Sequence, residues 1–91
     1  MKFEWDENKR QTNITKHGID FIDARKIFDY DTVTIEDNRF NYGEQRFIAI
    51  GLLNGKTIVV VYTEISNKIR IISARKATKN EQQIYFNEIY D

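Results

Sequence analysis

The sequence predicts a single domain of the α+β class, with an antiparallel β-sheet meander, two helices before it and one helix after it. Three observations lead to this prediction. The chain has 91 residues, which is enough for one hydrophobic core and too few for two. Three β-rich runs, residues 46–53, 56–64 and 68–75, follow one another with short turns between them. Helix-capping patterns occur on both sides of these runs, and no linker or repeat divides residues 1–91.

The chain begins with a short alternating segment, Phe3-Glu4-Trp5, that suits an edge strand. Asp6 is placed to cap the N-terminus of a helix over residues 7–17, and Gly18 is placed to end it. This helix carries almost no apolar residues. We therefore expect it to lie on the surface or to contact a partner.

A second helix is predicted after Asp20, another N-cap residue. Its apolar side chains recur at helical spacing: Phe21, Ala24, Ile27 and Phe28. Residues 29–31 end this helix. Residues 32–35 then alternate as a strand does, and residues 37–44 form a polar loop.

The hairpins and the last helix give the clearest local signals. Asn54-Gly55 lies between two β-rich runs and favours a two-residue type I′ turn. A second, less defined turn lies near Ser66-Asn67. Thr78 and Glu81 form a capping box that opens the final helix. The apolar face of this helix is expected to contain Ile84, Tyr85 and Ile89, with Phe86 or Tyr90 beside them.

The first turn fixes which residues face one another across the sheet. Counting outward from Asn54-Gly55, Arg46 lies opposite Thr63. If the second turn has two or four residues, Thr63 in turn lies opposite Arg70. The same face then carries an apolar set, Ile48, Ile50, Val59, Val61, Ile72 and Ala74. Arg75 falls on the opposite face unless a β-bulge intervenes.

Two arginines beside a threonine hydroxyl form a clamp suited to a phosphate, because a guanidinium offers planar, forked donors. Arginines this close repel one another, so an anion or an acid must offset the cost. In the alternative, structural interpretation, Glu44 or Glu64 pairs with them. The charge distribution also leaves both a binding role and a structural role open, because residues 46–79 carry seven basic side chains and a single acid, Glu64. Such a band suits phosphate, an acidic protein partner or simple solvation.

Other candidate residues are few. His17, at the end of the first helix, either stabilises the helix C-terminus or transfers protons near neutral pH. Trp5 either stacks on bases or fills the core. Tyr62 and Tyr85 either stack or donate protons, or they lie at the edge of the core.

Composition also predicts several absences. The chain contains one histidine and no cysteine, and we therefore expect no metal site and no cofactor. The longest apolar run, residues 58–62, is too short to span a bilayer, and no hydrophobic signal segment opens the chain. These features predict a cytoplasmic protein without a membrane partner.

Several segments together resemble the BrnT family of toxins, and they cover nearly the whole chain. The segments that carry the resemblance are Phe3-Glu4-Trp5-Asp6, Lys9, Asn13, Lys16-His17-Gly18-Ile19-Asp20-Phe21, Gly43-Glu44-Gln45-Arg46, Ile50-Gly51, Val61-Tyr62-Thr63-Glu64, Arg70-Ile71-Ile72-Ser73-Ala74-Arg75-Lys76-Ala77, Glu81 and Tyr85. The run from Arg70 to Ala77 is the most specific of them.

The resemblance implies a ribonuclease toxin of a type II toxin–antitoxin pair with a RelE-like fold. RNA would be the substrate, cleaved without a metal by attack of the ribose 2′-OH on the adjacent phosphate. The partner would be a BrnA-like antitoxin that carries its own DNA-binding domain. The toxin would then reach operator DNA only through the antitoxin, in a heterotetramer of two toxins and two antitoxins.

The resemblance also implies roles for individual residues. Arg70 and Arg75 would stabilise the phosphate charge, with Arg46 as a further cation. His17 or Glu44 would carry a proton. The remaining contacts to RNA phosphates would come from Lys16, Thr63 and Lys76.

The chain departs from the family pattern at Ile65. Members often carry arginine directly after the Thr-Glu pair. The departure implies a slow nuclease, with Lys68 as a partial substitute, or a degenerate toxin that only binds its antitoxin and regulates transcription. A third reading is a protein–protein adaptor that uses the polar first helix and the basic sheet.

Overall fold

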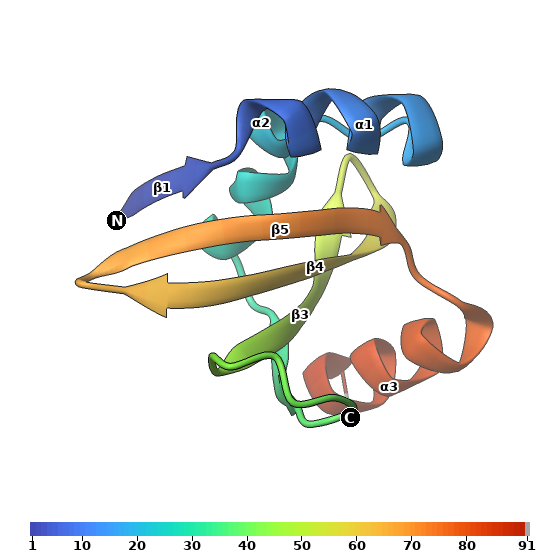
Figure 1. Ribbon diagram of the computed structural model, residues 1–91. Coiled ribbons are helices and arrows are strands. Elements are labelled where there is room, and N and C mark those ends of the chain that lie inside the picture. Colours follow the sequence, from blue (N-terminus) through green and yellow to red (C-terminus); the bar gives the residue numbers. More distant parts are fainter. Residues whose placement is uncertain (91) are drawn as a thin grey trace.

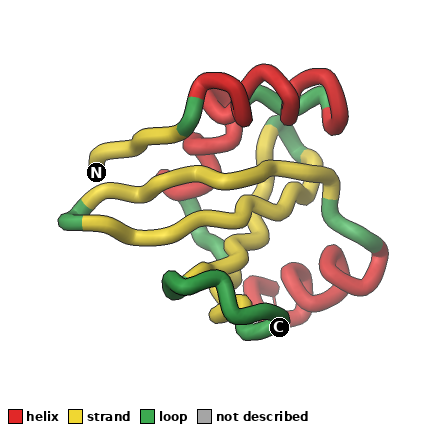
Figure 2. Tube along the Cα trace, in the orientation of Figure 1, coloured by secondary structure: helices red, strands yellow, loops and turns green. Residues whose placement is uncertain are grey.

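The computed structural model describes residues 1–90 and shows one five-stranded sheet with helical segments on both faces (Figures 1 and 2). The order across the sheet is β1-β5-β4-β3-β2. The elements along the chain are β1 (Lys2–Trp5), α1 (Glu7–His17), α2 (Phe21–Ala24), the 3₁₀ helix η1 (Arg25–Asp29), β2 (Val33–Asp37), β3 (Arg46–Leu53), β4 (Lys56–Ile65), β5 (Lys68–Lys76) and α3 (Lys79–Tyr90). The predicted α+β class and the order of elements are confirmed.

The expectation of a purely antiparallel sheet is wrong at one edge. Strands β2 to β5 form the predicted antiparallel meander, but β1 pairs in parallel with β5. No turn joins β1 to β5, because the helices and the whole meander lie between them, and therefore local sequence does not set their direction. The pairing buries Phe3 and Trp5 against the core and places Glu4 beside Arg70.

The second helix differs from the single helix that was predicted. Asp20 caps it as expected, accepting a hydrogen bond from the Ile22 backbone N–H at 2.9 Å. One α-helical turn, α2, continues directly into η1. Here η1 packs closely on β3, since a Cβ atom added to Gly51 would lie 2.9 Å from the Cβ of Ile27. The strand and loop that follow are also shifted: β2 spans Val33–Asp37, and Asp37, predicted to begin the loop, ends the strand.

Both hairpins have two-residue turns. Asn54 and Gly55 adopt positive φ angles of 52° and 79°, which confirms the type I′ prediction. Ser66 and Asn67 also have positive φ angles, 47° and 67°. The second turn therefore gives the register in which Thr63 pairs with Arg70, one of the two alternatives that the sequence allowed.

A β-bulge in β5 changes the second half of that strand. The pairs Tyr62–Ile71 and Val61–Ser73 leave Ile72 as an extra residue. Beyond the bulge, Ala74 pairs with Val60 and is fully buried under the N-terminal helical segments. The prediction that Ala74 shares a face with Val59 is therefore wrong, because that prediction assumed a regular strand.

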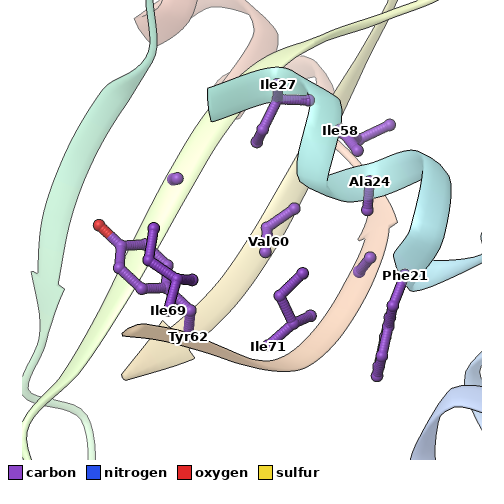
Figure 3. Close-up of a cluster of buried hydrophobic side chains, with 10 residues drawn as sticks. Phe21, Ala24, Ile27, Ile58, Val60, Tyr62, Ile69 and Ile71 are labelled. Carbon is purple, nitrogen blue, oxygen red and sulfur yellow. The ribbon is translucent and has the colours of Figure 1, made fainter. Parts of the chain in front are cut away.

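Two hydrophobic clusters fill the two sides of the sheet. The larger one lies between the sheet and the α2–η1 segment, and its buried members are Phe21, Ala24, Ile27, Ala49, Ile58, Val60, Tyr62, Ile69, Ile71 and Ala74 (Figure 3). The smaller one, Ile50, Val59 and Tyr85, lies under α3 with Ile84 and Ile89 packed against it. The predicted apolar face of the last helix is confirmed, while Phe86 and Tyr90 are exposed.

Asn13 of α1 closes the open edge of β5 beyond the end of β1. Its side-chain amide donates to the Ala74 carbonyl at 2.8 Å, and its carbonyl oxygen accepts from the Ala74 N–H at 3.1 Å. The amide also donates to the Ile19 carbonyl at 2.9 Å. One buried side chain thus takes the place of a neighbouring strand at this position.

Glu81 fixes the start of α3. Its carboxylate accepts from the Thr78 N–H at 2.9 Å, and the Thr78 hydroxyl accepts from the Glu81 N–H at 3.2 Å, which confirms the capping box. The guanidinium of Arg75 donates to both carboxylate oxygens, at 2.7 and 2.9 Å. Because Arg75 stabilises the charged carboxylate, the pKa of Glu81 falls to about 2.

The hydrogen bonds of Asn13 predict a stability effect. Asn13→Ala leaves the Ala74 N–H and two carbonyl oxygens without their partners, which should lower the free energy of unfolding by about 2–3 kcal/mol. Urea denaturation followed by circular dichroism measures this difference. The exposed Asn87 provides the control, because Asn87→Ala should change stability by less than about 0.5 kcal/mol. Equal midpoints for the two variants would contradict the role of Asn13.

The lowered pKa of Glu81 predicts a pH effect. An unfolded glutamate titrates near 4.5, so the stabilisation is complete above that pH and is lost as the pH falls from about 4.5 to about 2. Glu81→Gln should cost about 1–3 kcal/mol at pH 7 and should lose less stability than the wild type between pH 6 and pH 3. Glu88→Gln, on the exposed side of the same helix, is the control. Parallel pH profiles for wild type and Glu81→Gln would refute the assignment.

Candidate functional site

One row of polar side chains crosses the sheet at the end of β3 where Arg46 lies. Glu4 pairs with Arg70, Arg70 pairs with Thr63, and Asp37 pairs with Arg46. The β3–β4 register continues from Phe47–Tyr62, which places Arg46 opposite Thr63 as predicted. Paired residues point to the same side of a sheet. The row therefore presents two cations between two carboxylates on one face.

The bulge brings Arg75 to the same face. Arg75 pairs with Val59, which lies on the side of β4 that also carries Thr63. Without the extra residue, Arg75 would pair with Ile58 and point to the side of the sheet that is covered by α2 and η1. Along β4, Thr63 and Val59 are about 13 Å apart, with Val61 and its partner Ser73 between them. We call the surface formed by Arg46, Arg70 and Arg75 the arginine face.

Each arginine of this face is paired with a carboxylate from another element. Arg70 Nη1 lies 2.7 Å from Glu4 Oε2, and Arg46 Nε lies 3.3 Å from Glu44 Oε2. The two terminal nitrogens of the Arg75 guanidinium donate to the two carboxylate oxygens of Glu81, and this pairing raises the pKa of Arg75. The structural interpretation, in which Glu44 or Glu64 pairs with these arginines, thus holds for Arg46 and Glu44. The partner of Arg70 is Glu4 and not Glu64. An incoming phosphate must compete with these carboxylates.

Thr63 is part of the row but is not available for binding. Its side chain is buried, with 4% of the residue exposed, and its hydroxyl donates to the Gln45 carbonyl at 2.7 Å. The hydroxyl thus ties β4 to the start of β3. The geometry gives Thr63 a structural role beside the arginine face.

The loop between β2 and β3, residues 38–45, adds groups that the sequence analysis missed. The carboxylate of Asp37 accepts from Arg39 at 2.8 and 3.0 Å and from the Tyr42 hydroxyl at 3.0 Å. Arg39 holds the pKa of Asp37 well below its usual range. The guanidinium of Arg46 lies 3.9 Å from the centroid of the Tyr42 ring, which is a cation–π contact. The spacing Asp37-x-Arg39 was the only signal for this cluster in the sequence.

Lys16, His17 and Lys76 lie away from the arginine face. Lys16 and His17 border a shallow hollow together with Ile72 and Ser73 at the β5 edge. His17 also borders a second hollow with Lys56 and Lys76. Lys76 pairs with Ile58 and therefore belongs to the side of the sheet under α2 and η1. The structure brings Arg46, Arg70 and Arg75 together, and it separates them from Lys76.

The lysines that line these two hollows differ from the arginines of the arginine face in having no carboxylate partner within residues 1–90. Among the residues that the structure describes, no carboxylate lies within ion-pair distance of the lysines of the two hollows, Lys9, Lys16, Lys56 and Lys76. Lysines without an ion-pair partner in the described part of the chain therefore line both of the hollows that His17 borders. These lysines form a second cationic surface, which begins at the β5 edge.

The two candidate proton carriers are far apart. Glu44 contacts Arg46 at the start of β3, whereas His17 borders the same hollow as Leu53 at its end. An eight-residue strand is roughly 20–25 Å long. His17 and Glu44 therefore do not act on the same proton, and in the middle of β5 His17 shares only the hollow that Ile72 and Ser73 also line.

The aromatic candidates lie in the core. Trp5 packs edge-on against Phe21 at 6.2 Å between centroids, and Tyr62 contacts Phe28 in the same way at 5.2 Å. Burial raises the pKa of Tyr62 and of Tyr85. The core interpretation of Trp5, Tyr62 and Tyr85 is the one that the structure favours.

Within residues 1–90, no three histidine, cysteine, aspartate or glutamate side chains gather closely enough to hold a metal ion. Over the same part of the chain, none of the helices combines the length and the apolarity needed to cross a bilayer.

The chain is similar to known proteins in sequence and in fold. Residues 5–81 match the family model described as "Ribonuclease toxin, BrnT, of type II toxin-antitoxin system". The crystal structure of the Brucella abortus ribonuclease toxin BrnT superimposes with a TM-score of 0.71 at 38% identity. The match covers 87% of this chain and 99% of the Brucella chain. A comparison with curated proteins gave no match.

The family match includes Arg46, Arg70 and Arg75, which form the arginine face, and it ends at Glu81, which holds Arg75. The similarity of fold extends over nearly the whole length of the Brucella toxin. The chain therefore belongs to the BrnT family of ribonuclease toxins of type II toxin–antitoxin systems.

Proposed function

We propose that this protein is a metal-independent endoribonuclease whose arginine face binds the phosphate that is cleaved. The observation that carries the proposal is the β5 bulge, which places Arg75 on the same face as Arg70 and Arg46. Forked guanidinium donors on one surface suit a phosphate whose negative charge grows during the reaction. Their ion pairs with Glu4, Glu44 and Glu81 orient them before RNA binds.

The proposed reaction is an internal transesterification. The ribose 2′-oxygen attacks the adjacent phosphorus and loses its proton to a base. The bond from phosphorus to the 5′-oxygen then breaks, and that oxygen takes up a proton. The products are a 2′,3′-cyclic phosphate and a 5′-hydroxyl end, so that no oxidant, reductant or metal is consumed.

Arg70 and Arg75 are proposed to stabilise the charge of the pentacoordinate intermediate, with Arg46 in support. For proton transfer there are two candidates, His17 and Glu44. His17 borders a hollow that is also lined by Ser73, a residue between Arg70 and Arg75 in sequence, and this shared hollow supports its role. The ion pair with Arg46 places Glu44 at the other end of the face. Lys16 and Lys76 are proposed to contact flanking phosphates.

The proposed partner is a BrnA-like antitoxin, as membership of a type II toxin–antitoxin family suggests. We expect a cytoplasmic heterotetramer of two toxins and two antitoxins, with operator DNA bound only through the antitoxin. The exposed Ile35 and the half-buried Ile48, paired across β2 and β3 beside Arg46, provide an apolar area that such a partner can cover together with the cations. A RelE-like classification of the fold belongs to the same proposal.

A second function is supported by one observation. Ile65 occupies the end of β4, 46% exposed and on the same side as Thr63, where the family often has arginine. A catalytically degenerate toxin that only binds its antitoxin and regulates transcription would fit this loss, and it would fit the neutralisation of each remaining arginine by a carboxylate.

Cleavage of end-labelled RNA by the antitoxin-free chain in EDTA tests the main proposal. Wild type should cut RNA and leave 2′,3′-cyclic phosphate ends. Arg70→Ala and Arg75→Ala should each lower the rate about 10²–10³-fold, because each removes an oriented donor from the developing charge. Arg25→Ala, an exposed arginine of η1 outside this face, is the control. Absence of cleavage with normal antitoxin binding would favour the degenerate regulator, and full activity in both variants would refute the site.

Ile65→Arg tests whether the departure at this position limits activity. The new side chain would extend from β4 next to Arg70 and Lys68, on the side of the arginine face. We expect kcat to rise about 10-fold or more, since an added oriented cation stabilises the same charge. Ile65→Gln, of similar length without charge, is the matched control. An unchanged rate for Ile65→Arg would mean that this position does not contribute.

A further inference from the structure

Phe40 is an exposed aromatic side chain that belongs to neither hydrophobic cluster. It lies in the β2–β3 loop and is 69% exposed. Its ring meets that of Tyr42 edge-on, with the centroids 5.8 Å apart. Burial of a phenylalanine side chain stabilises a fold, and most of that stabilisation is not obtained at this position.

Hydrogen bonds and a cation–π contact hold the loop residues around Phe40 in place. The Asp37 carboxylate, whose side chain is 1% exposed, binds the guanidinium of Arg39 and the hydroxyl of Tyr42. It also accepts from the backbone N–H of Arg39 at 3.2 Å. On the other side, Arg46 lies against the Tyr42 ring at 3.9 Å. Hydrogen bonds therefore fix the residues on either side of Phe40, and its ring is presented to solvent on a defined platform.

The platform adjoins the arginine face. Asp37 and Arg46 are paired across β2 and β3, in the row that continues to Arg70. Arg39 binds Asp37, and Arg46 of the arginine face lies against the ring of Tyr42 in the same loop. Phe40 thus follows Arg39 in sequence, and its ring contacts Tyr42, which in turn contacts Arg46 of the arginine face.

An exposed aromatic ring beside cations is the arrangement with which proteins bind unpaired nucleobases. The ring stacks on the flat face of the base, and the cations bind the backbone that carries it. A base inside a duplex cannot take this position, because both of its faces are already stacked. The arrangement therefore selects single-stranded RNA.

We propose that Phe40, supported by Tyr42, is a base-stacking subsite for an unpaired nucleotide next to the phosphate bound on the arginine face. This inference rests on the proposed ribonuclease function, and it names the substrate class as single-stranded RNA. Phe40 acts on binding of the substrate and not on the reacting atoms.

Binding is tested with a fluorescein-labelled 12-nucleotide 2′-O-methyl RNA, which lacks the attacking hydroxyl, and with its duplex. Phe40→Ala should raise the Kd for the single strand about 5-fold or more, because the variant loses the stacking of one base on an aromatic ring. Phe40→Trp should retain tight binding, and the duplex should bind equally to all variants. Tyr30→Ala is the matched control, because Tyr30 is 75% exposed and precedes β2 by three residues, as Phe40 follows it by three.

Cleavage kinetics separate this inference from the function on which it rests. On single-stranded RNA, Phe40→Ala should raise KM while kcat stays within about 3-fold of wild type. If wild type cleaves RNA and Phe40→Ala binds and cleaves equally well, the subsite is refuted and the nuclease stands. If the 2′-O-methyl RNA shows the Phe40 dependence but RNA is never cut, the nuclease fails and the subsite stands. Loss of antitoxin binding with unchanged RNA binding would refute the subsite by making Phe40 a protein contact.

Discussion

One extra residue in β5 determines the layout of the site. Arg70 and Arg75 are five positions apart, and a regular strand would point them to opposite faces. The bulge at Ile72 turns both to the same face and moves Ala74 into the core. Asn13 binds the N–H and carbonyl of Ala74, so the helix α1 holds the strand just beyond the bulge. The arginine face therefore depends on a backbone irregularity that the edge contact stabilises.

The arginines of this face serve the fold as well as the proposed chemistry. Arg75 joins β5 to α3 through Glu81, and Arg70 joins β5 to β1 through Glu4. Such pairs hold the guanidinium groups in place before a substrate arrives, which reduces the ordering cost of binding. They also neutralise the charge that would attract RNA from a distance. In the proposed function, long-range attraction of RNA would then come from basic side chains that have no such partner among the described residues, including the lysines that line the two hollows beside His17.

The two cationic surfaces and the aromatic loop suggest a division of roles along the RNA. Unpaired lysines suit flanking phosphates, because long-range attraction needs no fixed geometry. The paired arginines suit the phosphate whose charge changes, because there orientation matters most. Phe40 suits the base, which has a flat face to cover. The family assignment supports an RNA substrate, and the separation of these surfaces would allow one chain of this size to contact several nucleotides.

The sequence by itself determined the elements, the first hairpin and the family, because these depend on neighbouring residues. Asn54-Gly55 fixed the register of β3 and β4, and the caps at Asp6 and Thr78 marked the helix starts. Only the tertiary structure decided the parallel pairing of β1, the bulge at Ile72 and the carboxylate partner of Arg70. Each of these joins segments distant in sequence, or depends on packing against α1. Local patterns carry no information on which distant groups meet, and therefore the face to which Arg75 points emerged only with the fold.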